Sequence, residues 1–379
     1  MEKVKVCIKE MLFFLMSKLP IQKKIVFCNF NGRGFGDDPK YITQELLSRN
    51  TSAKLVWLTD APKEGFPCEV EVVRYNSILA KYHFFTSRIW VLNTKNVNHP
   101  IKRKGQYYIQ TWHGGVFSLK KVEKAVENIP EYAKYVEMSK RDSTMIDLMY
   151  SDNDYVKEDY GRNFWYDGEV VKCGVPRESI LVNTPKNVPV HVRQKYNIPS
   201  GTKIVLYAPT FRGDFSMNAY RWNYNHVLDE MESKIGCPLI MLLRMHPNVA
   251  KESDDFVDTE RVRNASLYPD MQDLLAAADV YISDYSSASF EFACLRRKPV
   301  FLIGLDYEEY TRKERSFHLS WEELPFGVCK SEEELCDAVR NFSDECYQKK
   351  LDAFCELIGL EEDGMGASKL VDIIESKLR

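Results

Sequence analysis

Residues 280–293, VYISDYSSASFEFA, decide the class of fold that we expect for this chain. The apolar run Val280–Ser283 is followed by Asp284 and the hydroxyls of Ser286 and Ser287, and apolar residues then recur at three- and four-residue steps. This order predicts a buried strand, a tight loop and the beginning of a helix. The first helical turn exposes unpaired N–H groups and can bind a phosphate, although a serine that only caps the helix is the alternative. Asp284 would repel a phosphate, so we expect it to orient a ribose, a glycerol hydroxyl or a histidine.

The same alternation of strand and helix patterns runs along most of the chain. A polar stretch with three prolines, at 183–202, is the best candidate for an interdomain linker. Because a domain holds roughly 100–200 residues, 379 residues predict two domains. We expect α/β domains at 23–185 and 186–379, with a cleft between them and ligands beyond the carboxyl ends of parallel strands. The apolar runs that predict strands are 24–30, 54–58, 69–73, 89–92, 107–111 and 170–173, and then 203–207, 238–243, 280–283 and 300–303.

The composition excludes several classes of function. The net charge is −3, from 52 basic and 55 acidic residues, so there is no basic field for a nucleic acid partner. The ten cysteines form no C-x-x-C pair and no zinc spacing, which favours reduced thiols in a cytosolic protein. The sequence has no G-x-x-x-x-G-K-[ST] loop and no aspartate-rich metal motif. We therefore expect chemistry on a phosphate-bearing donor without an obvious metal and with no cofactor; whether a metal is required stays open.

Residues 1–22 predict a basic amphipathic helix that lies on a membrane surface. Lysines outnumber glutamates there, and Pro20 ends the pattern. A helix of this kind can bury its apolar face in the membrane interface, whereas packing of the helix on the domain is the alternative. No run approaches the roughly 20 apolar residues that a membrane span needs. The apolar residues at helical spacing are Val4, Ile8, Leu12, Leu15 and Leu19.

A histidine stands where one of the predicted strands ends. The segment 109–115, IQTWHGG, places His113 directly before two glycines. Histidine is the side chain best suited to act as a base near neutral pH. The glycines, of which Gly114 is the first, let backbone amides approach a ligand. His113 is therefore a candidate general base and Gly114 a candidate substrate contact, with a structural histidine as the alternative.

Arginines stand at three further turns or strand ends. In LLRMHP, Arg244 and His246 are two residues apart, so they share a face of an extended chain and suit an anionic ligand. LYAPTFR brings Thr210 and Arg212 into a polar loop after a strand, and GVPR ends in Arg177. The alternative is a cleft-lining salt bridge for Arg244 and His246, and a solvated surface arginine for Arg212 and Arg177.

Taken together, these motifs resemble one family. QTWHGG, GVPR, LYAPTFR, LRMHP and SDYSSASFEFACLRRKPVF occur in the order and approximate spacing of the CDP-glycerol glycerophosphotransferase family, the teichoic acid primases and polymerases of bacterial cell envelopes. The resemblance covers about residues 24–340. The chain departs from the family's pattern after the W-H-G, where it has Gly115-Val116-Phe117, and in a late P-G-P element, which Phe326-Gly327-Val328 replaces.

The resemblance implies a fold and an activity. The fold would be GT-B-like, with two Rossmann-like domains facing a central cleft, the first on the acceptor side and the second binding CDP-glycerol. Glycerol phosphate would pass from CDP-glycerol to an acceptor hydroxyl, with release of CMP. The implied roles are general base for His113, contact with the donor phosphates for His246 and Arg244, pyrophosphate binding for Arg177 and Arg212, phosphate binding for Ser286 and Ser287, and donor orientation for Asp284.

The resemblance also implies a cellular setting. The acceptor would be a lipid-linked saccharide, a teichoic acid or a capsule chain, and the enzyme would be peripheral on the cytoplasmic face of the bacterial membrane, next to an anionic surface. A homo-oligomer is compatible with this setting. Three alternatives stay open: a CDP-ribitol-dependent transferase, a nucleotide-sugar glycosyltransferase with the same two-domain layout, and a catalytically silent, membrane-associated binding module.

Overall fold

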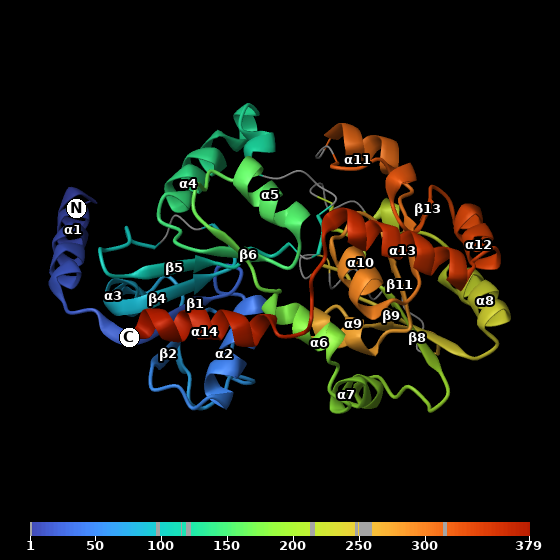
Figure 1. Ribbon diagram of the computed structural model, residues 1–379, viewed down its shortest axis with the longest axis horizontal. Coiled ribbons are helices and arrows are strands. Elements are labelled where there is room, and N and C mark those ends of the chain that lie inside the picture. The colour runs from blue at the N-terminus through green and yellow to red at the C-terminus, as the bar shows by residue number, and fades with distance from the viewer. Residues whose placement is uncertain are drawn as a thin grey trace. The chain divides into compact units, whose positions relative to one another are not determined.

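The chain divides into two compact units in the computed structural model (Figure 1). The first unit comprises Met1–His113, Val122–Arg177 and Met365–Arg379, and the second comprises Gly114–Lys121 and Glu178–Gly364. The expected domains at 23–185 and 186–379 are continuous segments, whereas the chain leaves the first unit after Arg177 and its last residues return to it. The residues that the structure describes are 2–95, 99–114, 116–118, 123–212, 217–246, 249, 260–313 and 317–379, apart from the side chains of 2–9 and 313.

The first unit is built on a five-stranded parallel sheet in the order β3-β2-β1-β4-β5. The order in which successive strands are added reverses between β1 and β4, and at such a switch point open parallel sheets bind ligands beyond the carboxyl ends of the strands. A second parallel sheet in this unit joins β6 to β7. The strands are β1 Gln22–Cys28, β2 Lys54–Thr59, β3 Glu71–Arg74, β4 Ser87–Leu92, β5 Tyr107–Gln110, β6 Met149–Ser151 and β7 Val170–Lys172.

Both faces of the five-stranded sheet are covered, so its strands are apolar throughout rather than alternating. Phe27 of β1 packs in one cluster with Ile42 of α2 (Asp37–Ser48) and Leu370 of α14 (Gly366–Leu378). Val26, the next residue back, faces the opposite cluster with Phe84 of α3 (Ile78–Thr86). The two clusters hold the sheet from both sides and leave its carboxyl edge to loops.

The second unit is built on a six-stranded parallel sheet in the order β10-β9-β8-β11-β12-β13. Tyr207 at the end of β8 pairs with Leu243 at the end of β9 and with Ile282 near the end of β11. Because these three strands end in register, the loops that follow them lie at one edge of the sheet. The strands are β8 Lys203–Tyr207, β9 Leu239–Leu243, β10 Val262–Asn264, β11 Val280–Ser283, β12 Val300–Ile303 and β13 Gly327–Cys329.

Helices cover the second sheet as well. Val205 and Met241 of the sheet pack with Leu228 of α8 and Leu335 of α12 in one core cluster. The polar stretch at 183–202, which the sequence suggests as a linker, contains α7, and this helix contacts α9 within the second unit. The remaining helices are α4 Ala133–Ser143, α5 Asp154–Asn163, α6 Ser179–Val182, α7 Asn187–Lys195, α8 Tyr224–Ile235, α9 Met271–Ala277, α10 Ala288–Glu291, the π-helix η7 Phe292–Arg296, α11 Tyr307–Lys313, α12 Glu332–Arg340 and α13 Asp344–Ile358.

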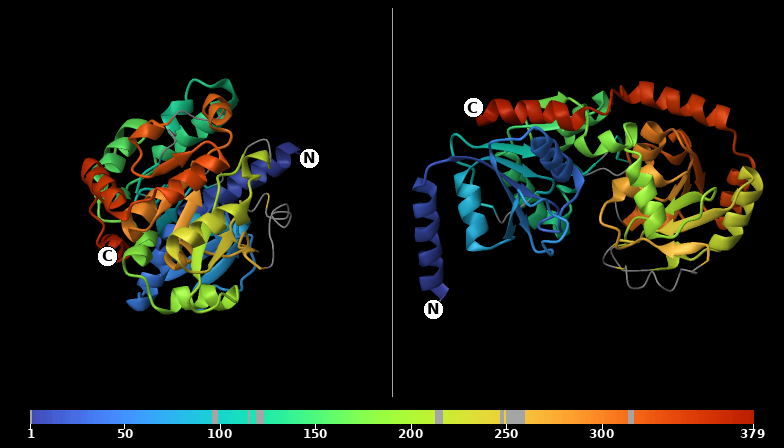
Figure 2. Two further views of the ribbon diagram at one scale, coloured as in Figure 1. Left: turned by 90° about the vertical axis from the view of Figure 1, so that its right-hand side faces the viewer. Right: turned by 90° about the horizontal axis from the view of Figure 1, so that it is seen from below.

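The N-terminal helix α1 (Glu2–Lys18) forms as the sequence predicts. It lies beside α3 in the first unit (Figure 2), with the rings of Phe13 and Phe85 5.6 Å apart and Met16 buried. Met11 and Phe14 are nevertheless 59% and 60% exposed. Within the described part of the chain, no helix has both the length and the apolarity that crossing a membrane requires.

Candidate active site

His113 follows β5 at the carboxyl edge of the first sheet, as predicted. Its Nδ1 lies 2.8 Å from the carbonyl oxygen of Asn93, which follows β4. A carbonyl can only accept, so Nδ1 carries the proton and Nε2 carries a lone pair. Nε2 has no hydrogen-bond partner among the described residues. Burial lowers the pKa of His113 below its ordinary value, with Arg177 acting in the same direction, so the ring is neutral near pH 7.

The side chain of Asn93 joins three segments around this histidine. Its Oδ1 accepts the N–H of Phe30 at 2.7 Å, and its Nδ2 donates to Asn29 and to Asp37, each at 2.7 Å. The rings of Trp112 and Phe30 lie 4.2 Å and 5.2 Å from the imidazole. The ends of β1 and β4 and the beginning of α2 therefore fix both the position and the tautomer of His113.

Backbone strain gathers in the same loops. Phe30, Asn31, Asp37 and Trp112 have φ of 39°, 57°, 55° and 54°, a left-handed conformation that residues other than glycine rarely adopt. Gly32 is needed beside them because its φ is 102° and an added Cβ would lie 2.9 Å from Tyr75. Strain of this kind costs about 1–3 kcal/mol per residue and tends to gather at functional sites.

Arg177 is held by two carboxylates. Its Nη1 lies 3.1 Å from Asp37 Oδ1 and 2.8 Å from Asp38 Oδ2, and its backbone N–H donates to Asp38 Oδ1 at 2.8 Å. The side chain of Arg177 is 5% exposed and that of Asp38 is fully buried. We call Arg177, Asp37 and Asp38 the first arginine cluster. It anchors the beginning of α2 beside His113.

Gly114, the other candidate in this motif, is half-buried directly after His113. Its neighbour Gly115 lies outside the described residues. Phe117, at the position where the chain departs from the family pattern, is buried against Phe290 and Phe354 of the second unit, with ring centroids 4.8 Å and 5.6 Å away. This phenylalanine therefore serves packing.

In the second unit, Asp284 follows β11, and its carboxylate contacts two backbone N–H groups and an arginine. Its Oδ1 accepts the N–H groups of Thr210 at 2.7 Å and Tyr285 at 2.6 Å, and its Oδ2 lies 2.9 Å from Arg212 Nη1. Only 2% of the Asp284 surface is exposed. The carboxylate thus joins the loop after β8 to the loop after β11, two of the segments singled out from the sequence.

Arg212 is paired with a second carboxylate. Its Nε and Nη2 donate to the two oxygens of Asp306 at 2.6 Å and 3.0 Å, and the hydroxyl of Tyr285 donates to Asp306 at 2.9 Å. Burial alone would lower the pKa of Arg212, but Asp284 and Asp306 hold it above its ordinary value. We call Arg212, Asp284 and Asp306 the second arginine cluster. Asp306 also lines a pocket of about 380 Å³ together with Gly304, Tyr307 and Lys330, among others.

Arg244 differs from the other two arginines. Its Nη1 donates to the carbonyl of Tyr268 at 2.5 Å, and no carboxylate within ion-pair distance is found among the described residues. Burial lowers the pKa of Arg244, and the negative charge of Asp270 opposes the shift only in part. His246 is half-buried with its ring 4.9 Å from that of Phe211, while Met245 between them is buried, which is the alternation of an extended chain. Arg244 is therefore a half-buried cation with N–H groups left for a ligand.

In the part of the chain that the structure describes, one serine hydroxyl of the loop before α10 is hydrogen-bonded and the other is not. The hydroxyl of Ser286 accepts the N–H of Ala288 at 3.3 Å, whereas Ser287, the N-cap residue of α10, makes no side-chain capping hydrogen bond. The hydroxyl of Ser287 has no hydrogen-bond partner among the described residues, and neither has the buried Oγ1 of Thr210. The helix α10 is short: it ends at Glu291, and the π-helix η7 follows it directly.

The chain matches a family model over residues 11–376, nearly its whole length. The model is that of the CDP-glycerol:poly(glycerophosphate) glycerophosphotransferases. The chain belongs to this family. The resemblance seen in the five sequence motifs and the α/β fold class are thereby confirmed.

Three relatives of this glycerophosphotransferase family member are informative. A teichoic acid poly(glycerol phosphate) polymerase of Staphylococcus epidermidis is 29% identical over 368 residues, covering 94% of this chain and 51% of the relative, so the chain spans about half the length of that protein. A teichoic acid glycerol-phosphate transferase of Staphylococcus aureus is 28% identical, with 96% and 95% covered. The solved wall teichoic acid polymerase TagF is similar with a TM-score of 0.84 and 26% identity, over 100% of this chain and 95% of that one.

Sequence reasoning missed several residues of the two clusters and of the histidine site. Asp306 lies in the segment 304–310, GLDYEEY, and Asp37 and Asp38 follow the segment 32–36, GRGFG; neither segment is among the motifs singled out above. A carboxylate after a strand or at a helix beginning would have been the signal for these. Asn93 carries no signal, because nothing in the sequence pairs it with a histidine twenty residues later.

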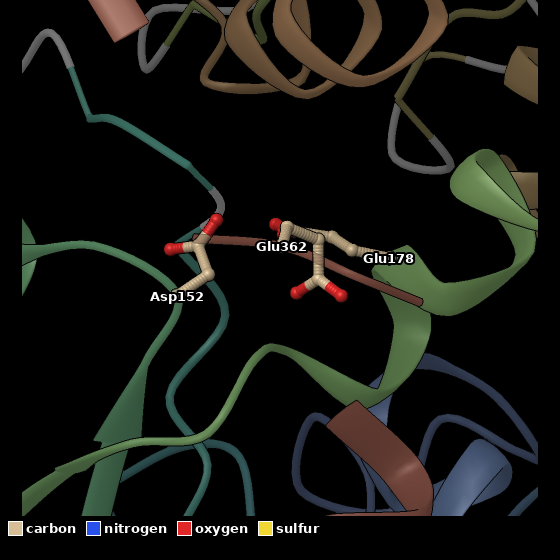
Figure 3. Close-up of side chains that lie close together, drawn as sticks. All are labelled: Asp152, Glu178 and Glu362. Atoms are coloured by element: carbon tan, nitrogen blue, oxygen red, sulfur yellow. The ribbon is translucent and has the colours of Figure 1, made fainter. Parts of the chain in front are cut away.

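Figure 3 shows the acidic side chains of Asp152, Glu178 and Glu362. Glu178 and Glu362 belong to the second unit, where a carboxylate oxygen of each lies within 4.8 Å of the other, and Asp152 belongs to the first unit. Two carboxylates do not by themselves define a metal site, so we assign none among the described residues. That the reaction needs no cofactor stays a prediction, and the sequence leaves a metal requirement open.

Proposed function

We propose that this chain transfers glycerol phosphate from CDP-glycerol to a hydroxyl of a membrane-associated acceptor and releases CMP. The acceptor would be a lipid-linked saccharide, a teichoic acid or a capsule chain. The observation that carries the proposal is the state of His113 in a member of the glycerophosphotransferase family: a neutral imidazole whose Nε2 is left for a substrate.

In this proposal His113 acts as the general base. Asn93 fixes the proton on Nδ1, so Nε2 accepts the proton of the acceptor hydroxyl as its oxygen attacks the phosphorus of glycerol phosphate. The low pKa keeps the base unprotonated at neutral pH. Phosphoryl transfer depends mainly on alignment and charge neutralisation, so one positioned base and a few cations suffice.

The donor phosphates would be bound by hydrogen-bond donors of the second unit that have no protein partner among the described residues. Arg244 has N–H groups without a carboxylate partner, and Ser287 has a hydroxyl without a partner, among the described residues. Both follow strands that end in register with β8, and Thr210 with its unpartnered Oγ1 follows β8 itself. His246, two residues after Arg244, would stabilise the charge that develops on the leaving CMP.

Arg177 and Arg212 take a different role in this proposal. Each is buried and engaged by two carboxylates, so neither is offered as a pyrophosphate ligand. They are positioning residues that fix the loops beside His113 and beside Asp284. Asp284 accordingly acts on the donor through the loops that it joins.

The test is CMP release from CDP-glycerol, with and without a lipid-linked disaccharide, followed by mass analysis of the product. We expect acceptor-dependent CMP and an added mass of one or more glycerol phosphate units. CDP-ribitol and UDP-sugars are run in parallel. Turnover of CDP-ribitol alone would make the chain a ribitolphosphotransferase, turnover of a UDP-sugar alone would make it a glycosyltransferase, and donor binding without any turnover would favour a silent binding module.

Two variants separate the base from the donor site. His113→Asn keeps an N–H that can donate to the Asn93 carbonyl but removes Nε2, so we expect kcat to fall by about 10²–10⁴-fold while CDP-glycerol still binds. Arg244→Gln should instead weaken CDP-glycerol binding. His191→Asn, which changes an exposed histidine of α7, is the matched control and should behave as wild type. Loss of donor binding in His113→Asn would move this residue to the donor site.

We further propose that the first unit binds an anionic membrane surface through α1 and α3. Phe14 and Leu15 of α1 are 60% and 55% exposed, and Ile78 at the beginning of α3 is 65% exposed. Because α1 packs beside α3, these apolar side chains belong to one part of the first unit. This surface would keep the enzyme peripheral at the cytoplasmic face of the membrane; a homo-oligomer stays a prediction.

Vesicle sedimentation tests this surface. The double variant Phe14→Ser and Leu15→Ser should release the protein from vesicles that contain an anionic lipid, without a change in its thermal unfolding. Leu267→Ser, which alters an 82% exposed leucine of the second unit, is the control and should bind as wild type does. Unchanged vesicle binding by the double variant would contradict the proposal.

A further inference from the structure

A chain of buried hydrogen bonds in the first unit runs from α4 to the loop that carries His113. It begins at Asp142 of α4, whose side chain is 1% exposed, and ends at the backbone N–H of Trp112. Tyr108 and Gln110 of β5 stand between these two ends, and both are fully buried. They are two residues apart in a strand, so their side chains share one face of it. The chain therefore connects α4, which contributes no residue to the proposed site, with the proposed general base.

The donor and acceptor roles at the α4 end follow from the contacts of His99. Its Nδ1 lies 3.0 Å from the carbonyl oxygen of Pro100, which can only accept, so Nδ1 carries a proton. Its Nε2 lies 2.6 Å from Oδ1 of Asp142, and a second proton lies between these two atoms because two lone pairs would repel each other. Whichever atom holds that proton, Oδ2 of Asp142 is left to accept the hydroxyl of Tyr108 at 3.1 Å. Asp142 is thus fixed as the acceptor at which the chain begins.

Tyr108 in turn fixes the orientation of the Gln110 amide. Burial and the charge of Asp142 raise the pKa of Tyr108 well above its ordinary value, so the hydroxyl keeps its single proton and donates it to Asp142. Only lone pairs of that oxygen face Gln110, so the amide group that contacts it at 2.8 Å is the NH2 group. The amide oxygen then faces the backbone N–H of Trp112, at 3.0 Å. A half-turn of the amide would place two N–H donors against each other.

Gln110 contacts both backbone segments that meet in the hydrogen bond of His113. On one side its Oε1 accepts the N–H of Trp112, the residue directly before the histidine. On the other side its Nε2 also donates to the carbonyl of Thr94 at 3.3 Å, and Thr94 directly follows Asn93, whose carbonyl accepts Nδ1 of the histidine. Trp112 has a φ of 54°, and its ring lies 4.2 Å from the imidazole. A change in the backbone of Trp112 would therefore move the histidine ring.

We propose that Gln110 is a positioning residue, which keeps Nδ1 of His113 on the Asn93 carbonyl and leaves Nε2 to the acceptor hydroxyl. Tyr108 and Asp142 act one step further away, because they prevent the amide from turning over. The effect on turnover rests on the proposed function, whereas the effect on the tautomer of His113 does not. The competing explanation is that the chain only stabilises the packing of α4 against β5. Its loss would then lower stability without changing the state of the histidine.

The first measurement is the tautomer of His113, read from the nitrogen NMR shifts of its ring in the full chain with labelled histidine. We expect the proton on Nδ1 in wild type and a mixture of both tautomers in Gln110→Leu. Tyr108→Phe removes only a hydroxyl and should give a smaller change of the same kind, which decides the question if Gln110→Leu does not fold. Tyr107→Phe, on the opposite face of β5, is the matched control and should behave as wild type. An unchanged Nδ1 tautomer in the folded variants would overturn the proposal.

The second measurement is turnover of CDP-glycerol, which separates positioning from a purely structural role. Gln110→Leu should lower kcat by about 10–100-fold with the Kd for CDP-glycerol unchanged, because a misplacement of about 1 Å at a reacting group can cost that much. Adding Tyr108→Phe to Gln110→Leu should lower kcat no further, since the hydroxyl acts only through the amide. Losses that multiply in the double variant would indicate general loosening and overturn the proposal. Failure of wild type to turn over CDP-glycerol would instead overturn the proposed function, and the tautomer measurement would still decide this inference.

Discussion

Each of the two arginine clusters pairs one buried arginine with two carboxylates, but the carboxylates come from different kinds of element. In the first unit, Arg177 is held by Asp37 and Asp38, neighbours in sequence at the beginning of α2. In the second unit, Arg212 is held by Asp284 and Asp306, which follow two different strands. Each cluster sets one arginine between two carboxylates at the carboxyl edge of a parallel sheet.

The difference lies in what supports the carboxylates apart from the arginine. The two acids of the first cluster lie in the first turn of a twelve-residue helix, where the positive end of the helix dipole stabilises negative charge. In the second cluster, Asp284 accepts the N–H groups of Thr210 and Tyr285. Asp306 accepts the hydroxyl of Tyr285, and aromatic rings lie against the arginine. The second cluster therefore depends on its arginine mainly through Asp306.

The largest effect should come from Arg212→Met. Removing this cation leaves two carboxylates without their charge partner, and breaking a buried ion pair in this way costs about 3–5 kcal/mol. The loops after β8, β11 and β12 would lose their common contact at the same time. The measurement is the free energy of unfolding from denaturant titration. A loss below about 1 kcal/mol would show that the cluster is solvated and that our account of it is wrong.

Arg177→Met should cost less, about 1–3 kcal/mol, because hydrogen bonds to charged groups contribute about that much and the helix dipole still stabilises Asp37 and Asp38. The same denaturant titration gives the value. Arg74→Met, at an 86% exposed arginine of the first unit, is the control and should change stability little. If Arg177→Met proved more destabilising than Arg212→Met, the contrast between the clusters would be reversed.

Much of the fold could be predicted because strand patterns are local. The runs at 203–207, 280–283 and 300–303 coincide with β8, β11 and β12. The strands β6, β10 and β13 were missed, since a run of three residues gives no periodicity; β7, which is equally short, falls within the predicted apolar run 170–173. The return of α14 to the first unit was also missed, because the pattern of an amphipathic helix does not say which sheet its apolar face will cover.

The candidate site shows the same limit for side chains. The motifs singled out His113, Arg244 and the serines, and the structure leaves polar atoms unpartnered in that set among the described residues. An arginine after a strand, however, looks the same in sequence whether it contacts a ligand or a carboxylate. Only the spatial neighbours of Arg177 and Arg212, far away in the chain, separate these two cases.

A smaller effect is expected from Tyr285→Phe, which removes one hydrogen bond from the second cluster. Its hydroxyl donates to Asp306 Oδ1 at 2.9 Å, while the ring keeps its stacking on Tyr310, 3.9 Å away. Loss of this bond should reduce the free energy of unfolding by about 0.5–1.5 kcal/mol, or somewhat more because the acceptor is charged. In an Arg212→Met background the bond should become more important, since it is then the main side-chain contact of Asp306. Additive losses in the double variant would contradict this coupling.

The smallest effect concerns how the charges of the first cluster shift the pKa of His113. Arg177 lowers the pKa of His113, and Asp37 raises it. In Arg177→Met the cation is gone and both carboxylates remain, so the protonated imidazole becomes more favourable and the pKa should rise. In the proposed function His113 is the general base, and a base must be unprotonated, so the acid limb of the kcat/KM profile should then move to higher pH. Arg212→Met lies in the other unit and should leave this limb in place, which NMR titration of the His113 ring can check without turnover. A shift in both variants would mean that the limb reports general loosening of the protein rather than the charge of the first cluster.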